Sequence, residues 1–250
     1  MVTNTNDRLI PITRRLGSAE VKNPSLYSLV LENESFQFES GNYEVAILLL
    51  EGEARAEFHN EQFSIKRSGW KDENPSVFHL CSGEKLSLST DKKSRFIVMQ
   101  TENLQSFPSK FYAPEDVQTE HRGEGILNNT CYRLVRTVFD NSKNHKNAKL
   151  ILGEVLNFPG SWSSYPPHHH EQDEIYYYEM DPSEGFGFGQ CGEDVYKIRH
   201  GDLLCISGGK DHSQVSAPGY TMFYIWVIQQ EATPYTGFEF TKPYDKVLNA

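Results

Sequence analysis

The chain has 250 residues, of which 38% are hydrophobic and 23% are charged, as in an ordinary soluble globular protein. Its formal net charge of −10 at pH 7 argues against nucleic acid or an anionic membrane surface as the main partner. No apolar run approaches the roughly 18 residues of a membrane span, and the N-terminus has no apolar signal-peptide core, so we expect a cytoplasmic protein.

The first half of the chain reads as many short strands that follow an irregular arm. Residues 1–24 form the arm, because prolines and a glycine are scattered there among charges. Short apolar runs with β-branched and aromatic residues then alternate with turn signals such as Glu51-Gly52. The predicted strands are 26–31, 43–50, 54–58, 63–66, 77–81, 86–89 and 95–99.

The second half repeats this pattern after a polar crossover at 101–120. No segment shows a long helical period, and many short strands at close spacing are typical of a β-sandwich or barrel. We therefore expect an all-β protein. The predicted strands here are 132–138, 149–157, 174–180, 186–191, 195–198, 203–206 and 221–228.

A weak internal repeat relates the two halves. Residues 63–70 resemble 195–202, and each copy is followed by an apolar strand and a Ser-Gly pair. Past the serine, the second copy continues into Asp211-His212, where the first has Leu86-Ser87. The repeat predicts two related β units, 1–118 and 119–250, with metal chemistry only in the second.

Three adjacent histidines and a nearby carboxylate indicate that metal chemistry. His168 and His170 are two apart, so on a strand their side chains share one face and can meet one ion, while His169 faces outward. Glu174 can return to that ion after a turn and opens a strand, which favours it over Glu171 and Asp173. A polar loop with no ion is the alternative, and a further ligand must come from elsewhere.

This arrangement resembles the cupin superfamily, whose two motifs are both present. The first motif, a Gly, His-x-His and a Glu, is matched by Gly160, His168, His170 and Glu174. The second motif, a Gly, an apolar strand, a turn and a His, is matched by Gly201, 203–206, 207–211 and His212. The resemblance implies a bicupin of two double-stranded β-helix (jelly-roll) barrels, with a metal held only in the C-terminal barrel by His168, His170, Glu174 and His212.

Two departures from the cupin pattern affect the turn rather than the ligands. Ser207 stands where proline is usual, and no Asn follows His212 at the customary place. Three neutral imidazoles and one carboxylate suit one divalent ion, for which Zn or Mn is favoured and Fe, Co or Ni are alternatives. The other histidines are expected to be structural or surface residues: His59, His79, His145, His169 and His200.

Several unusual strings narrow the resemblance. They are Gly-x-Trp-Ser-Ser-Tyr-Pro-Pro within 157–167, His121-Arg122-Gly123, Arg136-Thr137, 174–182, Gly185-Phe186 and Pro218-Gly219-Tyr220. They resemble the 5-deoxy-glucuronate isomerase family of inositol catabolism, which is related to the uronate ketol-isomerases. The resemblance covers about 119–230 well and the first half only by its strand pattern. The 171–173 segment is shorter than is common in that family.

The resemblance implies an aldose–ketose isomerisation of 5-deoxy-glucuronate to 5-dehydro-2-deoxy-gluconate through an enediolate. Such a reaction needs a divalent ion at the carbonyl and a base that moves a proton between neighbouring carbons. Glu154, Tyr176 and Tyr178 are the candidates for the base. Arg122 or Arg136 could clamp the carboxylate of the sugar acid. Each tyrosine could instead be a core residue, and each arginine an ion-pair partner.

Two other functions use the same ligands. A cupin dioxygenase would hold Fe or Ni, and a non-catalytic sugar-acid binder would need no base. We expect a small-molecule sugar acid as partner, without nucleic acid or membrane, and the oligomeric state, homo-oligomer included, stays open.

Overall fold

The computed structural model describes residues 8–249, which contain strands and short 3-10 turns but no α-helix. The chain divides into two compact units. Within the described residues, unit 1 comprises 8–12, 23–118 and 142–150, and unit 2 comprises 13–22, 119–141 and 151–249. No helix in this part of the chain is long and apolar enough to span a membrane.

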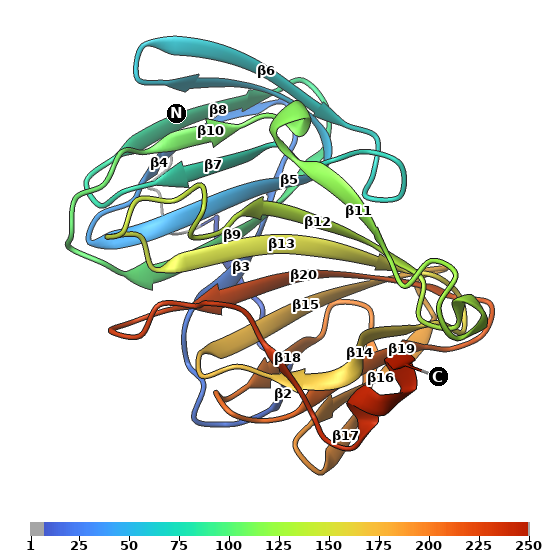
Figure 1. Cartoon of the computed structure of the whole chain (residues 1–250). Helices are drawn as coiled ribbons and strands as arrows, with labels where there is room; N and C mark the ends of the chain where they lie inside the picture. The colour runs from blue at the N-terminus through green and yellow to red at the C-terminus, as the bar shows by residue number, and fades with distance from the viewer. Residues whose placement is uncertain (1–7, 250) are drawn as a thin grey trace. The chain divides into compact units, whose positions relative to one another are not determined.

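Unit 1 is built around one long central strand, β5. Its sheet runs β1-β3-β9-β5-β7-β10, and β4, β8 and β6 join through the second half of β5 (Figure 1). The strands are β1 (Ile10–Pro11), β3 (Ser25–Leu31), β4 (Glu34–Glu39), β5 (Tyr43–Phe58), β6 (Glu61–Arg67), β7 (Val77–Leu80), β8 (Lys85–Thr90), β9 (Ser94–Glu102) and β10 (Lys110–Tyr112). A 3-10 turn, η1 (Pro114–Asp116), follows them.

Strand β5 corrects one sequence expectation. The turn predicted at Glu51-Gly52 is wrong, because 43–58 is one strand with a register shift between Leu49 and Glu51. Gly52 has a φ of +117°, and a Cβ there would lie 2.6 Å from the Cα of Ser94. A glycine at this position lets the strand bend without ending, so that β5 pairs with β9 and β7 before the bend and with β6 and β8 after it.

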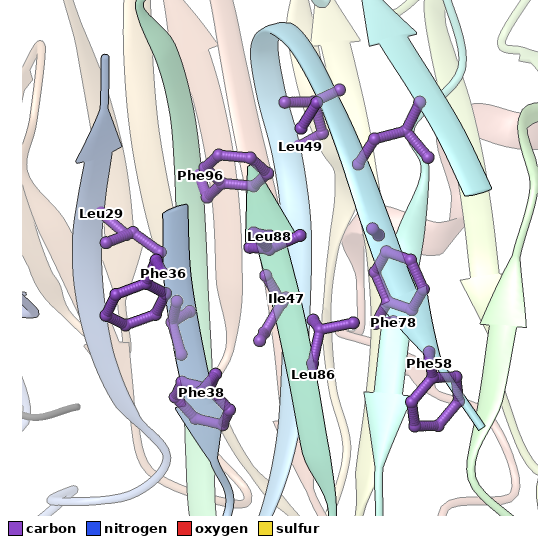
Figure 2. Close-up of a cluster of buried hydrophobic side chains, with 14 of the residues drawn as sticks. Leu29, Phe36, Phe38, Ile47, Leu49, Phe58, Phe78, Leu86, Leu88 and Phe96 are labelled. Atoms are coloured by element: carbon purple, nitrogen blue, oxygen red, sulfur yellow. The ribbon is translucent and has the colours of Figure 1, made fainter. Parts of the chain in front are cut away.

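The core of unit 1 is a cluster of alternating apolar side chains from both parts of this sheet. Figure 2 shows the labelled members pointing toward one another: Leu29, Phe36, Phe38, Ile47, Leu49, Phe58, Phe78, Leu86, Leu88 and Phe96. Each is nearly fully buried, which contributes about 1.5–3 kcal/mol per side chain. The period of two in β4, β8 and the second half of β5 therefore directs one face of each to the core.

Unit 2 consists of two sheets. The larger runs β11-β12-β13-β20-β15-β18-β2 and the smaller β17-β16-β19-β14-β21 (Figure 1). The strands of the larger sheet are β2 (Arg15–Gly17), β11 (Gln118–Arg122), β12 (Arg133–Phe139), β13 (Leu150–Asn157), β15 (Asp173–Asp181), β18 (Leu203–Ile206) and β20 (Thr221–Gln229). Those of the smaller are β14 (Trp162–His169), β16 (Phe186–Cys191), β17 (Asp194–Arg199), β19 (His212–Ser216) and β21 (Glu239–Phe240). Two 3-10 turns, η2 (Leu127–Asn129) and η3 (Tyr244–Asn249), also belong to it.

The two sheets of unit 2 enclose a core of their own. Tyr178, Leu204 and Tyr224 from the larger sheet and Cys191 and Ile198 from the smaller belong to one buried cluster. The N-terminal arm, 1–24, was predicted to be irregular but contains two short strands, β1 in unit 1 and β2 in unit 2. Strand β2 pairs in parallel with β18. Residues 1–7 of the arm lie outside the described part of the chain.

Unit 1 also contains a fully buried carboxylate, Glu44 on β5. It accepts hydrogen bonds from His79 Nε2 at 2.8 Å, Asn103 Nδ2 at 2.7 Å and the backbone N–H groups of Lys149 and Leu150 at 2.7 and 2.9 Å. Burial by itself raises the pKa of Glu44, but the hydrogen bond and charge of His79, with the other donors, outweigh it, and the net pKa lies below its ordinary value of 4.5. The ionised carboxylate therefore ties 142–150 to the strands of unit 1.

Replacing this carboxylate with an amide tests its contribution. Because the folded-state pKa of Glu44 is depressed, its stabilisation is complete above about pH 4.5 and is lost as the pH falls through the folded-state value. We expect Glu44→Gln to lower the unfolding free energy by about 1–3 kcal/mol near neutral pH, because an amide NH₂ would face donors that now meet oxygens. Urea unfolding of both proteins near neutral pH and in acid should show this difference shrinking in acid. A difference independent of pH would contradict the assignment.

Candidate functional site

Four side chains from two sheets converge inside unit 2. His168 ends β14 with His169, His170 follows it, and His212 opens the neighbouring strand β19, where it pairs with His168. Glu174 lies on β15 of the other sheet, between Ile206 of β18 and Ile228 of β20. The antiparallel pairing of β14 with β19 and the alternation along β15 direct the three imidazoles and the carboxylate inward.

The distances in this cluster suit a shared ion. Glu174 Oε2 lies 3.2 Å from His170 Nε2 and 3.4 Å from His212 Nε2, and the ligand atoms of these three residues are all within 4.8 Å of one another. The ring of His168 lies beside them, with its centroid 4.3 Å from that of His212. The structure therefore groups His170, Glu174 and His212 directly and places His168 next to them.

The protonation of the histidines fits a cation site. Burial, together with a neighbouring imidazole of the cluster, lowers the pKa of His168 and of His212 to about 3, so both rings are neutral near pH 7. Nδ1 of His212 donates to the carbonyl of Lys210 at 3.0 Å, which leaves a lone pair on the buried Nε2 that faces Glu174 and makes no hydrogen bond. A lone pair and a carboxylate that face each other in a buried site are what a divalent cation binds.

The short segment after the histidines is held against the turn that precedes β19. Asp173 Oδ1 accepts a hydrogen bond from the N–H of Gly208 at 3.0 Å, and Gly209 N–H donates to the carbonyl of His170 at 2.7 Å. A Cβ at Gly208 would lie 1.9 Å from the carbonyl oxygen of Glu171, so only glycine fits there. Asp173, a rival ligand in the sequence, thus supports a turn beside the cluster.

The cluster opens into a cavity of about 570 Å³, within the range of roughly 300–1,000 Å³ typical of small-molecule sites. Charged and aromatic side chains line it: Arg122, Arg133, Asp140, Tyr165, His168, His170, Glu174, Tyr176, Tyr224, Trp226, Tyr235, Phe238 and Phe240. All of these residues belong to unit 2. The cavity combines two arginines, two carboxyl groups and aromatic walls, so it offers both donors for an anionic group and acceptors for hydroxyl groups.

Of the residues predicted to act on the substrate, Tyr176 and Arg122 line this cavity. Burial raises the pKa of Tyr176 well above its ordinary value, and the charge of Glu174 raises it further, so the phenol keeps its proton. Arg122 is partly exposed, and its Nε lies 3.0 Å from Glu120 Oε2.

The other three predicted residues lie away from the lining. Tyr178 is buried in the core and donates to Gln214 Oε1 at 2.7 Å. Arg136 and Glu154 face each other across β12 and β13, with Nη1 and Oε1 2.8 Å apart and 4% and 0% of their side chains exposed. Their strand neighbours Val135 and Val155 line the cavity, so alternation directs this ion pair to the opposite face of the sheet.

Sequence reasoning missed two groups of cavity residues. Arg133 lies on β12 two residues before Val135, so both side chains point to the cavity face of the strand. Its half-buried guanidinium donates from Nη1 to the carbonyl of Cys131 at 2.8 Å. The two-residue alternation of side chains along the predicted strand was the signal that could have identified Arg133. The second group, Tyr235 and Phe238, follows the last predicted strand and carries no recognisable pattern. Burial raises the pKa of Tyr235 to about 12.

Known proteins resemble almost the whole chain. A 5-deoxy-glucuronate isomerase of Shouchella clausii (strain KSM-K16) is 26% identical over 215 residues, which are 78% of this chain and 77% of that protein. The crystal structure of an IolB-like protein from Salmonella typhimurium LT2 superposes with a TM-score of 0.82 at 20% identity, covering 93% of this chain and 92% of that one.

The fold is also that of a cupin. A Cupin 2 conserved barrel domain protein from Leptotrichia buccalis matches with a TM-score of 0.51 at 12% identity over 92% of each chain. The all-β architecture expected from the sequence, with cupin-like neighbours, is therefore confirmed. The model of the KduI/IolB family matches residues 4–247, and the chain belongs to that family.

Proposed function

We propose that this protein is an isomerase of inositol catabolism that converts 5-deoxy-glucuronate to 5-dehydro-2-deoxy-gluconate, an aldose–ketose isomerisation. One observation carries the proposal: a single cavity places the His–Glu cluster together with two arginines, in a chain of the KduI/IolB family. Two relatives named 5-deoxy-glucuronate isomerase each match 78% of this chain. A small sugar acid fits both the volume and the charges of the site.

One divalent ion, Zn or Mn, would be held by His168, His170, Glu174 and His212. Three of these residues already offer ligand atoms within 4.8 Å of one another, and the ring of His168 lies beside them, with its centroid 4.3 Å from that of His212. When bound, such an ion would polarise the carbonyl and the adjacent hydroxyl of the sugar and so acidify the C–H between them.

The two arginines of the lining would bind the substrate carboxylate. Arg133 lies half-buried in the wall, and Arg122 lies at a more exposed part of the same lining. A guanidinium presents paired N–H donors that match the two oxygens of a carboxylate. Arg136, the other sequence candidate, would instead hold β12 to β13 through Glu154.

Two groups of the lining would serve the proton transfers of the isomerisation, one at the substrate oxygen and one at carbon. The phenol of Tyr176 stands beside Glu174, and Asp140 is the other carboxylate among the described lining residues. Because the pKa of Tyr176 is raised, we assign it the protonated role, donating to the substrate oxygen on which charge develops. Asp140 would accept the proton from carbon. Glu154 and Tyr178 would have structural roles, since their contacts engage them elsewhere.

We further propose that both units are jelly-roll barrels, so that the chain is a bicupin with domains at about 1–118 and 119–250. Strands β6 and β17, which contain the repeated sequence, each close a hairpin, with β5 and β16 respectively. Within residues 8–249, the only grouped set of metal-type ligands lies in unit 2. His79 of unit 1 bonds Glu44. These features support a metal-free first barrel, with 13–22 and 142–150 exchanged between the units.

Metal content tests the ligand assignment. We expect the wild-type protein to bind about one equivalent of Zn²⁺ or Mn²⁺ and His170→Ala and His212→Ala to lose at least 100-fold in affinity, because each removes one of the four ligands. Chelator competition and elemental analysis measure both. His145→Ala, an exposed histidine of unit 1, is the matched control and should bind as the wild type does. Undiminished binding by both ligand variants would refute the site.

Turnover tests the reaction. Metal-loaded protein incubated with 5-deoxy-glucuronate in D₂O should form the ketose, observed by NMR, and should incorporate deuterium at the carbon that receives the proton. The same protein loaded with Fe²⁺ should consume no O₂, because isomerisation is redox-neutral overall. Binding without conversion under every tested divalent metal would indicate a sugar-acid binder, and O₂ consumption would indicate a dioxygenase.

Variants of Tyr176 and Tyr178, both on β15, distinguish a tyrosine that acts on the substrate from one that only packs in the core. Tyr176→Phe should lower kcat by about 100-fold or more with a small change in KM, because it removes the donor beside the reacting oxygen. Tyr178→Phe makes the same chemical change two residues away on the same face, removes only the bond to Gln214, and should keep kcat within about threefold. Steady-state kinetics of both variants measure these changes in kcat. A larger loss of kcat in Tyr178→Phe than in Tyr176→Phe would assign the proton-donor role to Tyr178 instead.

A further inference from the structure

The backbone ladder between β14 and β19 is interrupted just before the predicted ligands. Trp162 pairs with Val215 and Ser163 with Gln214, and the next pair is His168 with His212. Five steps along β14 thus correspond to two along β19, with an irregularity between them. Regular strand pairing therefore does not by itself set the separation of the histidines on the two strands.

A side-chain contact on the outer face bridges the strands where the ladder is weak. Nδ1 of His169 donates to Oδ1 of Asp211 at 2.8 Å. His169 lies between His168 and His170 and points to the opposite face, and Asp211 directly precedes His212. This one charge-assisted contact thus joins the immediate chain neighbours of all three histidine ligands.

The same carboxylate also holds a third segment. Oγ1 of Thr241 donates to Oδ1 of Asp211 at 2.6 Å, and the N–H of Thr241 donates to the carbonyl of Pro167 at 2.8 Å. Just before Thr241, strand β21 pairs with the end of β14. In this pairing Phe240 lies opposite His168 and Glu239 lies opposite His169. Residues 235–241, here called the C-terminal strap, are in this way attached alongside the ligand strand.

The strap brings aromatic rings onto the predicted ligands. The ring centroid of Phe238 lies 4.4 Å from that of His168, and the centroid of Tyr235 lies 5.3 Å from that of His170 at an interplanar angle of 90°. Both aromatic residues line the cavity. The strap therefore forms one wall of the cavity, next to the predicted ligands His168 and His170.

We propose that His169, Asp211 and Thr241 form an outer clamp of positioning residues that sets the spacing of the metal ligands on β14 and β19 and holds the strap over the cavity. The inference deepens the proposed metal site and rests on it. Side chains that orient ligands from outside the coordination shell typically change metal affinity by about 10–100-fold when removed. A contact that served only stability would lower Tm and leave that affinity unchanged.

Zn²⁺ affinity of the intact protein, measured by competition with a chromophoric chelator, tests the clamp. Asp211→Ala removes both hydrogen bonds and should weaken Zn²⁺ binding about 10–100-fold. Asp211→Asn keeps an acceptor oxygen for both donors and should restore affinity to within about threefold. Glu184→Ala, an exposed acid in the turn between β15 and β16, is the control and should match the wild type. Asp211→Ala with an affinity within twofold of the wild type overturns the proposal, whatever its Tm.

A second variant covers the case in which Asp211→Ala does not fold. Thr241→Val keeps the side-chain shape but removes the donor, so hydrogen exchange at the amides of 238–241 should speed up at least tenfold in the Zn²⁺-loaded protein. Exchange equal to that of the wild type overturns the clamp. Neither readout needs turnover, so a wild-type protein that binds Zn²⁺ and converts no sugar acid refutes the isomerase while the clamp is still decided by its own measurements.

Discussion

The site depends on two facing sheets that bring unlike side chains into one buried space. One sheet supplies imidazoles from adjacent antiparallel strands, and the other supplies the Glu174 carboxylate from a strand enclosed on both sides by β18 and β20. His170, Glu174 and His212 are almost fully buried and His168 is half-buried, and burial keeps His168 and His212 neutral by lowering their pKa. Burial thus keeps lone pairs available on these imidazoles beside the Glu174 carboxyl group, which is a donor set that a divalent cation can bind.

The alternation of side chains along a strand then decides which other residues line the cavity. Arg133 and Arg136 are on the same strand, three apart, and therefore point to opposite faces of the sheet. One lines the cavity, and the other forms an ion pair with Glu154 on the far side, where a buried carboxylate must have a partner. Charged residues close together in sequence can thus have separate surroundings, the cavity wall for Arg133 and an ion pair between β12 and β13 for Arg136.

The two units are both built from β-sheets around an apolar core, but they differ in the polar groups that they bury. In unit 1 the long strand β5 bends at Gly52 and encloses an aromatic and aliphatic core, and its buried histidine bonds Glu44. In unit 2 the core is rich in tyrosine and continues into the cavity through Tyr176 and Tyr224. Hydroxyl groups at that border allow an apolar core to meet a polar ligand without leaving donors unsatisfied.

The sequence by itself determined the strand content, the family and the metal-type residues, because alternation and motif spacing are local properties of the chain. It could not reveal that the turn signal at Glu51-Gly52 is a bend inside β5, since that depends on the close approach of Ser94 from a distant strand. Nor could it identify the contacts of Tyr235, Phe238 and Thr241 with the site. Those contacts join segments tens of residues apart, and only the tertiary structure, through the pairing of β21 with β14, brings them to the histidines.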